Sequence, residues 1–465
     1  MRRTKLIATL GPATAVPGVI DGLVSAGLDV ARLNTSHAGI SELGAQLAAV
    51  RDASHRAGRH VAVMLDLCGP KVRLGEVAEG TTLEAGAAFD LIADGGIGDA
   101  RRATVSYPAL HADVSPGDRI LLDDGRIELV VTRVADGVVS TRVEAGGPLS
   151  SRKGVNVPGV RLGLEGLTSA DLQNLAWAQD AGIDLIAQSF VRSAADVAAL
   201  RAAMGARVLP IVVKIEKHEA LGQVDAIVAE ADAVMVARGD LGVETAPETV
   251  PVAQRRVVAA CRAAGKPVIV ATQMLESMTA ARRPTRAEAS DVANAIFDEV
   301  DAVMLSGETA IGRHPVHVLS TMDRIVRAAE EAVSTRVPVS AAAPSLDVAG
   351  AVSRAVCELA ADLDVVAIVT VTQSGATARA VAADRPRVPV LAATPDEAIA
   401  RQLALVWGIR PAVIGSYESI DTMIEAAARA ARDAGMATPG DLVAVTGGVA
   451  VHVSGSTDFI QVHRV

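Results

Sequence analysis

Short runs of apolar residues recur along most of this chain, and polar residues follow each run. Ala-rich stretches with helical spacing, and small turns that often contain Gly, separate the runs. Strands that alternate with helices predict βαβ units in a parallel sheet, and eight units favour a closed (β/α)8 TIM barrel. An open doubly wound sheet is the alternative. The eight runs are residues 5–9, 29–33, 61–65, 184–187, 208–213, 233–237, 267–271 and 302–305.

The stretch between the third and fourth runs differs in composition from its surroundings. Short β-branched segments alternate there with turns such as Pro116-Gly117-Asp118, a pattern typical of a small all-β module. Because the module emerges from a barrel loop, we expect it to form a lid over the site beneath. The predicted strands of this module are residues 81–83, 87–92, 119–122, 128–134 and 138–143.

A linker rich in Pro and Ala, residues 337–345, follows the last predicted barrel helix. Beyond it, apolar runs at 365–371, 388–391, 411–414 and 442–445 alternate with Ala-rich helices, which predicts a doubly wound α/β domain. The predicted domains are a barrel (1–67 and 164–333), an inserted β lid (68–163) and a C-terminal α/β domain (346–465).

Composition and charge narrow the function classes. Half of the residues are hydrophobic and 2% are aromatic, which suits α/β layers built from Ala, Val, Leu and Ile. The net charge of −10 argues against a nucleic-acid or membrane partner. Cys68, Cys261 and Cys357 are widely spaced, which fits reduced thiols and neither a disulfide frame nor a zinc site. With no apolar signal segment, the sequence predicts a cytoplasmic protein.

Two successive predicted strands lead into charged residues of both signs. Lys214 and Glu216 follow one run, and Arg238 and Asp240 follow the next. The carboxyl ends of parallel strands face the crevice where ligands bind, so these side chains should converge there. Carboxylates suit a hard divalent ion such as Mg²⁺, and Lys and Arg suit an anionic substrate. Surface salt bridges are the alternative, but two such strand ends in succession favour an active site.

Longer motifs resemble those of the pyruvate kinase family, and the resemblance covers nearly the whole chain. It implies a barrel with a β lid after the third strand and a C-terminal regulatory domain. It also implies transfer of the phosphoryl group of phosphoenolpyruvate to ADP, giving pyruvate and ATP in glycolysis, by a homotetramer. The motifs are residues 31–37 (ARLNTSH), 214–216 (KIE), 234–244 (VMVARGDLGVE), 271–278 (ATQMLESM) and 283–309 (RPTRAEASDVANAIFDEVDAVMLSGET).

The resemblance also implies roles for individual residues. Glu216 and Asp240 would hold Mg²⁺, with Mn²⁺ as an alternative ion, and Thr272 would help deliver a proton to the enolate carbon through water. Taken alone, Thr272 is more often a strand-end hydroxyl bonded to backbone. The implied catalytic residues are Lys214, Thr272, Arg32 and Arg73; the substrate-binding residues are Arg32, Ser189, Lys214, Arg238, Gly239, Asp240 and Thr272; and the nucleotide-binding residues are Arg32, His37 and Lys153.

One departure from the family concerns the monovalent cation. Lys71 stands where many family members have Glu. A Lys ammonium is a compact cation on a flexible stem, and its repulsion of K⁺ at about 4 Å is roughly 4 kcal/mol at an effective dielectric of 20. We therefore expect Lys71 to replace K⁺ and the enzyme not to require it. By resemblance, the pocket consists of Asn34, Ser36, Asp66 and the carbonyl of Leu67.

A second departure concerns regulation. Gln373 and Ala376 occupy positions that are Lys and Arg in members regulated by fructose bisphosphate. Hydroxyls and Gly at a strand-to-helix turn can still surround an anion, although a capped helix start without a ligand is the more frequent meaning. We expect a phosphorylated effector with one phosphate, either a sugar phosphate or AMP. The predicted effector residues are Thr372, Ser374, Gly375, Thr377, Ser456 and Thr457.

Two alternatives to this function remain at the level of the sequence. One is another barrel enzyme that acts on phosphoenolpyruvate or pyruvate by carbon–carbon chemistry, although the inserted lid and the threonine of ATQM count against it. The other is a metabolite sensor that has kept the fold and lost catalysis. Such a sensor needs a lost ligand, whereas Lys214, Glu216, Asp240 and Thr272 are all present.

Overall fold

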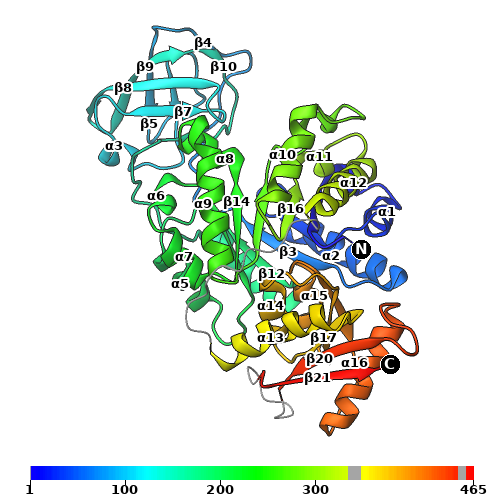
Figure 1. Cartoon of the computed structure of the whole chain (residues 1–465). Coiled ribbons are helices and arrows are strands. Elements are labelled where there is room, and N and C mark those ends of the chain that lie inside the picture. The colour runs from blue at the N-terminus through cyan, green and yellow to red at the C-terminus, as the bar shows by residue number, and fades with distance from the viewer. Residues whose placement is uncertain (1, 334–346, 449–456) are drawn as a thin grey trace.

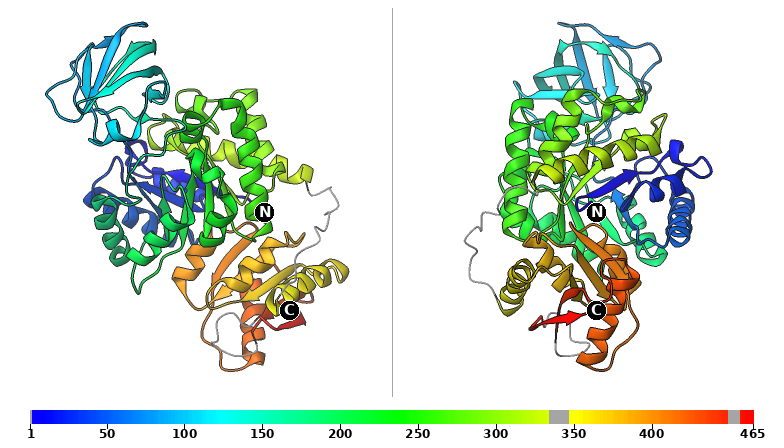
Figure 2. Two further views of the ribbon diagram at one scale, coloured as in Figure 1. Left: turned by 90° about the vertical axis from the view of Figure 1, so that its left-hand side faces the viewer. Right: turned by 45° about the vertical axis from the view of Figure 1, so that its right-hand side comes forward.

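A computed structural model of the protein describes residues 2–333, 347–448 and 457–465. A β lid, a closed barrel and a C-terminal α/β domain follow one another along the molecule (Figure 1). Two further views place the lid and the C-terminal domain at opposite ends of the barrel (Figure 2). The predicted fold class is confirmed, and the closed barrel decides against an open sheet.

Eight parallel strands close the barrel, because the last of them pairs with the first. Alternate side chains of each strand face opposite ways: Leu6 packs toward the helices outside, whereas Ile7 faces the interior. In spatial order the strands are β1 (Lys5–Thr9), β2 (Val30–Asn34), β3 (Ala62–Leu67), β12 (Leu185–Gln188), β13 (Ile211–Ile215), β14 (Ala233–Ala237), β15 (Val268–Ala271) and β16 (Ala302–Leu305).

Helices cover the outside of the barrel, and their buried faces form one apolar cluster with the outward side chains of the strands. Such amphipathic faces are what the helical spacing of the Ala-rich stretches predicts. The helices are α1 (Val19–Ser25), α2 (Ile40–Ala57), α4 (Ser169–Ala181), α5 (Ala194–Ala203), α6 (His218–Leu221), α7 (Val224–Glu230), α8 (Arg238–Glu244), α9 (Val250–Ala263), α10 (Arg286–Phe297), α11 (Gly307–Ala310) and α12 (Pro315–Val333), with short 3₁₀ turns at η1 (Pro12–Thr14), η2 (Pro247–Thr249) and η3 (Glu276–Thr279).

An aspartate stands immediately before every second barrel strand. Its carboxylate accepts a hydrogen bond from a backbone N–H at the start of the neighbouring strand. These four contacts, which lie at the amino ends of the strands, fix neighbouring strands in register. They are Asp29 with Leu6 (2.9 Å), Asp184 with Val63 (2.7 Å), Asp232 with Ile211 (2.9 Å) and Asp301 with Val268 (3.0 Å).

The lid has an apolar core of its own, which includes Phe89 and Leu129. Its main sheet has the spatial order β11-β7-β8-β9-β5-β6, and a small pair, β10-β4, lies beside it. The elements are β4 (Thr82–Leu83), β5 (Ala88–Ile92), β6 (Arg102–Thr104), α3 (Leu110–Asp113), β7 (Arg119–Leu122), β8 (Ile127–Ala135), β9 (Val138–Ala145), β10 (Gly147–Pro148) and β11 (Val155–Asn156).

The C-terminal domain is a five-stranded sheet between helices. α13 (Val348–Asp362), α14 (Ala376–Ala383) and α15 (Glu397–Leu403) cover one face, and α16 (Ile420–Asp433) covers the other. The last strand runs antiparallel to its neighbour. In spatial order the strands are β19 (Ile409–Val413), β18 (Val390–Thr394), β17 (Ala367–Val371), β20 (Leu442–Gly447) and β21 (Phe459–Arg464).

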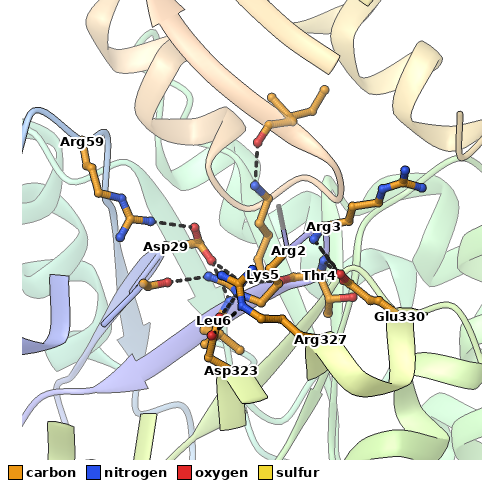
Figure 3. Close-up of polar contacts among 12 residues, drawn as sticks. Arg2, Arg3, Thr4, Lys5, Leu6, Asp29, Arg59, Asp323, Arg327 and Glu330 are labelled. Atoms are coloured by element: carbon orange, nitrogen blue, oxygen red, sulfur yellow. Dashed lines mark hydrogen bonds and ion pairs between the residues drawn. The ribbon is translucent and has the colours of Figure 1, made fainter. Parts of the chain in front are cut away.

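The C-terminal domain closes the amino end of the barrel. Leu405, which follows α15, belongs to the apolar cluster of the barrel interior. Lys5 donates a hydrogen bond to the carbonyl of Ile409 at 2.6 Å, and Arg401 pairs with Asp184 at 2.8 Å. Around Lys5, buried charges form the network drawn in Figure 3, in which Arg2 pairs with Asp29 at 2.7 Å. Among the described residues, no helix is both long enough and apolar enough to cross a membrane.

Candidate active site

The charged residues predicted at the strand ends meet at the carboxyl end of the barrel. β13 ends at Ile215, two residues beyond the predicted run, so Lys214 lies within the strand and Glu216 follows it directly. Arg238, Gly239 and Asp240 form the first turn of α8, which begins where β14 ends. Because the strands are parallel, these residues share one face of the barrel with those from β2, β3, β12 and β15.

The Lys214 ammonium lies at the centre of this face. It donates to the Ser189 hydroxyl at 2.7 Å and lies 3.4 Å from Asp66 and 3.3 Å from Glu216. Its burial by itself would lower the pKa of Lys214, but the carboxylates of Asp66 and Glu216 outweigh that effect and raise it. The site therefore favours the charged form of Lys214 and fixes its ammonium through three contacts.

Arg32 is fixed beside Lys214 through a shared carboxylate. Its Nε and Nη2 atoms each lie 2.7 Å from one oxygen of Asp66, and its Nη1 donates to the Thr9 hydroxyl at 3.0 Å. The other Asp66 oxygen accepts from Ser189 at 3.1 Å. Burial would raise the pKa of Asp66, but Lys214 and Arg32 outweigh it and lower this pKa. Asp66 therefore orients two cations toward the mouth of the barrel.

Glu216 is fully buried, and its oxygens are unequally satisfied. One accepts from the amide of Phe190 at 2.7 Å, whereas the other accepts no hydrogen bond among the described residues and lies 3.3 Å from the Lys214 ammonium. Burial raises the pKa of Glu216, Lys214 opposes this, and the carboxylates of Asp240 and Asp66 raise it further. Mutually repelling carboxylates with a spare oxygen, in a buried setting, fit a divalent cation held by Glu216 and Asp240.

Thr272 and Arg238 hold the turns after β14 and β15 together. The Thr272 hydroxyl donates to the carbonyl of Ala271 at 2.6 Å and accepts from the amide of Gly239 at 2.7 Å. Arg238 donates to the Thr272 carbonyl at 2.7 Å and pairs with Asp291 at 2.7 Å. Thr272 has φ +69°, a left-handed conformation that is unusual for a β-branched residue and often occurs at functional sites.

The residues predicted to contact nucleotide lie near the root of the lid. Burial and the nearby Arg73, Arg32 and Lys71 lower the pKa of His37, so these four side chains share one region. Arg73 donates to the carbonyl of Arg152 at 3.2 Å. Lys153 lies in the lid, where it pairs with Asp123 at 2.7 Å, and is not joined to the residues around Lys214 by any contact in the described part of the chain.

Lys71 is not where the sequence analysis expected it. Its ammonium lies 3.1 Å from Asp240 and over the ring of Phe190, rather than among Asn34, Ser36, Asp66 and Leu67. The reason is electrostatic: Asp66 is already neutralised by Arg32 and Lys214, whereas Asp240 is an accessible carboxylate. Within the expected pocket, the Asn34 side chain accepts from the amide of Ser36 at 3.1 Å.

The predicted effector residues gather at the start of α14. The amide of Gly375, which has φ +79°, donates to the Thr372 hydroxyl at 2.9 Å. The hydroxyls of Thr377 and Thr457 lie 2.6 Å apart. The carbonyl of Ser374 accepts from Arg379 at 2.9 Å, and Ser456 lies outside the described residues. Arg379 is a cation that sequence analysis did not include in this group.

Sequence analysis missed three further residues that shape the site. Thr9 and Asp291 anchor Arg32 and Arg238, and both lie on elements far away in the sequence. The buried carboxylate of Glu244 joins barrel and lid, because one of its oxygens accepts from Lys217 at 2.7 Å and from Asn156 at 2.8 Å. Thr9 ends the first predicted strand and Asp291 lies within the motif 283–309, but only the fold identifies their partners.

Fixed cations and buried carboxylates at the mouth of a lidded barrel define an enzyme that handles anionic phosphoryl groups. Comparison with known families identifies it further. The family described as "Pyruvate kinase, barrel domain" matches residues 1–319, and "Pyruvate kinase, alpha/beta domain" matches residues 350–463. The chain belongs to the pyruvate kinase family, whose members are phosphotransferases acting on phosphoenolpyruvate and ADP with a divalent metal ion. Membership excludes a barrel enzyme of carbon–carbon chemistry.

Several curated relatives support this membership over nearly the full length of this chain. A pyruvate kinase from Geobacillus stearothermophilus is 44% identical over 470 residues, which cover 99% of this chain and 80% of the relative. One from Mycobacterium tuberculosis is 43% identical over 468 residues, covering 100% of this chain and 98% of the relative. One from Clostridium acetobutylicum is 40% identical over 472 residues, which cover 100% of each.

Proposed function

We propose that the phosphoryl group passes from phosphoenolpyruvate to ADP beside Lys214, and that Lys214 is the main cation of the transition state. The observation that carries this proposal is the immobilised Lys214 ammonium, bonded to Ser189 and flanked by Asp66 and Glu216. A loose phosphoryl-transfer transition state needs positioned positive charge more than covalent chemistry. Arg32 and Arg73 would add charge from the β2 side and the lid side.

We assign the divalent ion, Mg²⁺ or Mn²⁺, to Glu216 and Asp240. Support comes from the Glu216 oxygen that accepts no hydrogen bond among the described residues and from the effect of Asp240 on the pKa of Glu216. When bound, the ion would neutralise the carboxylate and phosphoryl oxygens of the substrate. Lys71 would then lose its contact with Asp240, and its own ammonium would remain as a cation beside the metal site.

The remaining roles follow from position. Ser189, Arg238 and Gly239 would bind or frame phosphoenolpyruvate, and His37 and Lys153 would contact the phosphates of ADP. The Thr272 hydroxyl is committed to the carbonyl of Ala271 and the amide of Gly239, so it would relay a proton to the enolate carbon through a water molecule.

Two substitutions separate the two halves of the reaction. Lys214→Met should reduce phosphoryl transfer by about 10²–10³, because one preorganised electrostatic contact is lost. It should retain exchange of the C3 protons of bound pyruvate. Thr272→Ala should show the opposite bias, with proton exchange reduced more than phosphoryl transfer. Thr249→Ala, which removes an exposed hydroxyl bonded to a backbone carbonyl, serves as the control. Equal loss of both activities in Lys214→Met and Thr272→Ala would contradict the division.

We also propose that the enzyme does not require K⁺, because Lys71 supplies a positive charge at the mouth of the barrel. Support comes from its position against Asp240, on a flexible side chain. Turnover in a tetramethylammonium buffer should not rise when KCl is added. Lys71→Glu should acquire a K⁺ requirement, and Lys71→Met, which adds no negative charge, should acquire a smaller one. Strong KCl stimulation of the unmodified enzyme would overturn this proposal.

For regulation, we propose activation by a monophosphate, either a sugar phosphate or AMP, bound by Thr372, Ser374, Gly375, Thr377 and the turn containing Ser456 and Thr457. The hydroxyls and the nearby Arg379 suit one phosphate group better than two. Activation titrations with AMP, a sugar monophosphate and fructose 1,6-bisphosphate test this. The proposal fails if fructose 1,6-bisphosphate is the sole activator.

A further inference from the structure

Three side chains of the types that bind metal ions meet where the barrel adjoins the lid. His218 begins α6, Glu219 follows it, and Glu244 ends α8. One nitrogen or oxygen atom from each side chain lies within 4.8 Å of the other two. Both helices lie on the side of the barrel next to the lid (Figure 1). None of the three residues has a role in the proposed phosphoryl transfer.

The atoms that converge in this cluster are buried and lack hydrogen bonds. His218 Nδ1, Glu219 Oε2 and Glu244 Oε2 make no hydrogen bond in the described part of the chain. The Glu244 side chain is 0% exposed, and it is the other oxygen, Oε1, that accepts from Lys217 and Asn156. Burying a carboxylate oxygen without a hydrogen bond is unfavourable, so a native structure usually supplies it with a ligand or water. The Glu244 Oε2 atom therefore indicates a ligand site.

The spacing of these atoms fits a small four-coordinate ion. His218 Nδ1 lies 3.0 Å from Glu219 Oε2 and 3.7 Å from Glu244 Oε2. A tetrahedral Zn²⁺ with ligands at about 2.0–2.2 Å holds their donor atoms roughly 3.3–3.6 Å apart. A protonated imidazole offers one Nδ1 hydrogen to two carboxylate oxygens, whereas one metal ion satisfies all three atoms. A cavity of about 30 Å³, lined in part by Asn156, Lys217 and Glu219, has room for a water molecule as the fourth ligand.

We propose that His218, Glu219 and Glu244 form a second metal site, which binds a transition-metal ion such as Zn²⁺ or Co²⁺. An imidazole nitrogen with two carboxylates suits these ions, whereas Mg²⁺ prefers six oxygen ligands. The two carboxylates and the Lys217 ammonium leave one net negative charge, which attracts a divalent cation. This site does not depend on the assignment of the catalytic ion to Glu216 and Asp240.

The second metal site has direct connections to the lid and to the catalytic site. Glu244 accepts a hydrogen bond from Asn156 of the lid strand β11 at 2.8 Å. α8 carries Asp240 in its first turn and Glu244 at its end, so four residues, or about 6 Å of helix, separate the two carboxylates along the chain. An ion bound to Glu244 would therefore fix the end of α8 and, through Asn156, the contact between lid and barrel.

Titration of the full-length protein with Co²⁺, after removal of metal ions by a chelator, tests the site. Four-coordinate Co²⁺ absorbs visible light far more strongly than the hydrated ion, and this absorption should appear saturably. Zn²⁺ should displace the Co²⁺, whereas a large excess of Mg²⁺ should not. His218→Asn and Glu219→Gln should each weaken Co²⁺ binding at least about tenfold, because even the loss of a residue that only holds a ligand costs about 10–100-fold. Glu230→Gln makes the second change at an exposed position on α7 and should leave the affinity unchanged.

A catalytic-site variant and a measurement of folding complete the test. Asp240→Asn should keep the strong Co²⁺ absorption, because it changes a proposed ligand of the catalytic ion only. Circular dichroism and urea unfolding in the presence of chelator show whether each variant is folded. The proposal is overturned if the unmodified protein gives no saturable absorption, if Mg²⁺ displaces the Co²⁺, or if a folded His218→Asn or Glu219→Gln variant binds with full affinity. Loss of the absorption in Asp240→Asn would assign the Co²⁺ to the catalytic ion site and likewise reject the second site.

Discussion

Both ends of the barrel bury charged side chains, but the two ends satisfy them differently. At the amino end, Asp184 accepts from a strand amide, from Arg51 and from Arg401, at 2.7, 2.8 and 2.8 Å. At the carboxyl end, Glu216 is equally buried but has one oxygen without a hydrogen bond among the described residues. Saturated carboxylates hold strands and domains together, whereas an unsaturated one is available to a ligand.

The difference teaches that burial and charge alone do not identify a functional residue. Asp29 and Asp66 are both buried aspartates whose pKa the neighbouring cations lower against the effect of burial. Asp29 is bonded to a strand amide and fixes the register of the barrel. Among the described residues, the Asp66 carboxylate is bonded only by side chains that face the mouth, namely those of Arg32, Ser189 and Lys214. The direction in which the partners point separates structure from catalysis.

The largest expected effect is on stability, at the amino end. Asp184→Ala should reduce the free energy of unfolding by about 3–5 kcal/mol, because two guanidinium groups and an amide lose a buried partner. The folded fraction should retain its kcat. Asp21→Ala removes a surface aspartate that pairs with Arg56, and should cost at most about 1 kcal/mol. Urea unfolding measures the stability of both variants, and kinetics at low temperature measure the kcat of their folded fractions. A loss of kcat without a loss of stability in Asp184→Ala would contradict the structural role assigned to carboxylates at the amino end.

The second effect is on activity, at the carboxyl end. Even the loss of a residue that only holds a metal ligand in place typically costs about 10–100-fold. Asp240 is proposed to bind the ion directly, so Asp240→Asn should reduce kcat/KM at limiting Mg²⁺ by at least about 100-fold. The free energy of unfolding should change little, because Asp240 is partly exposed and, in the described part of the chain, is bonded only by Lys71. Asp225→Asn changes an exposed aspartate on α7 and should leave turnover unchanged. Near-normal turnover of Asp240→Asn at limiting Mg²⁺ would remove Asp240 from the metal site.

The sequence predicted the barrel well because each of its strands is a continuous apolar run between helices. The bounds of 5–9, 233–237 and 302–305 agree with β1, β14 and β16, and the other five differ by one to three residues at an end. Short pairing strands such as β6 and β10 carry too few apolar residues to give a signal. β21 was missed because it is an antiparallel edge strand with polar residues among its apolar ones.

For the site, the sequence indicated which strand ends carry chemistry, because polar residues after apolar runs mark the mouth of a barrel. It could not indicate partners that depend on three-dimensional contacts. Lys71 was expected in a pocket beside Asp66, yet its ammonium contacts Asp240, which is remote in sequence.

The smallest expected effect is the dependence of the free energy of unfolding on pH that Lys5 causes at the amino end of the barrel. The pKa of Lys5 is lowered from an ordinary value of 10.5 to about 8, chiefly by burial; Arg2 and Arg59 act in the same direction, and Asp29 and Glu330 oppose them. Between these two pKa values the unfolded chain binds the proton more tightly than the folded protein does. This group therefore makes the free energy of unfolding rise with pH through that window.

Between pH 7 and pH 9 the gain from Lys5 should be about 1 kcal/mol, because only the part of the window just above its folded pKa is crossed. Urea unfolding of the unmodified protein and of Lys5→Met at pH 7, 8 and 9 isolates it, since the other titrating groups contribute equally to both proteins. Stability of the unmodified protein relative to Lys5→Met should increase with pH. Parallel pH profiles would contradict the lowered pKa, because they would mean that Lys5 keeps its ordinary pKa or a higher one and stays charged at the base of the barrel.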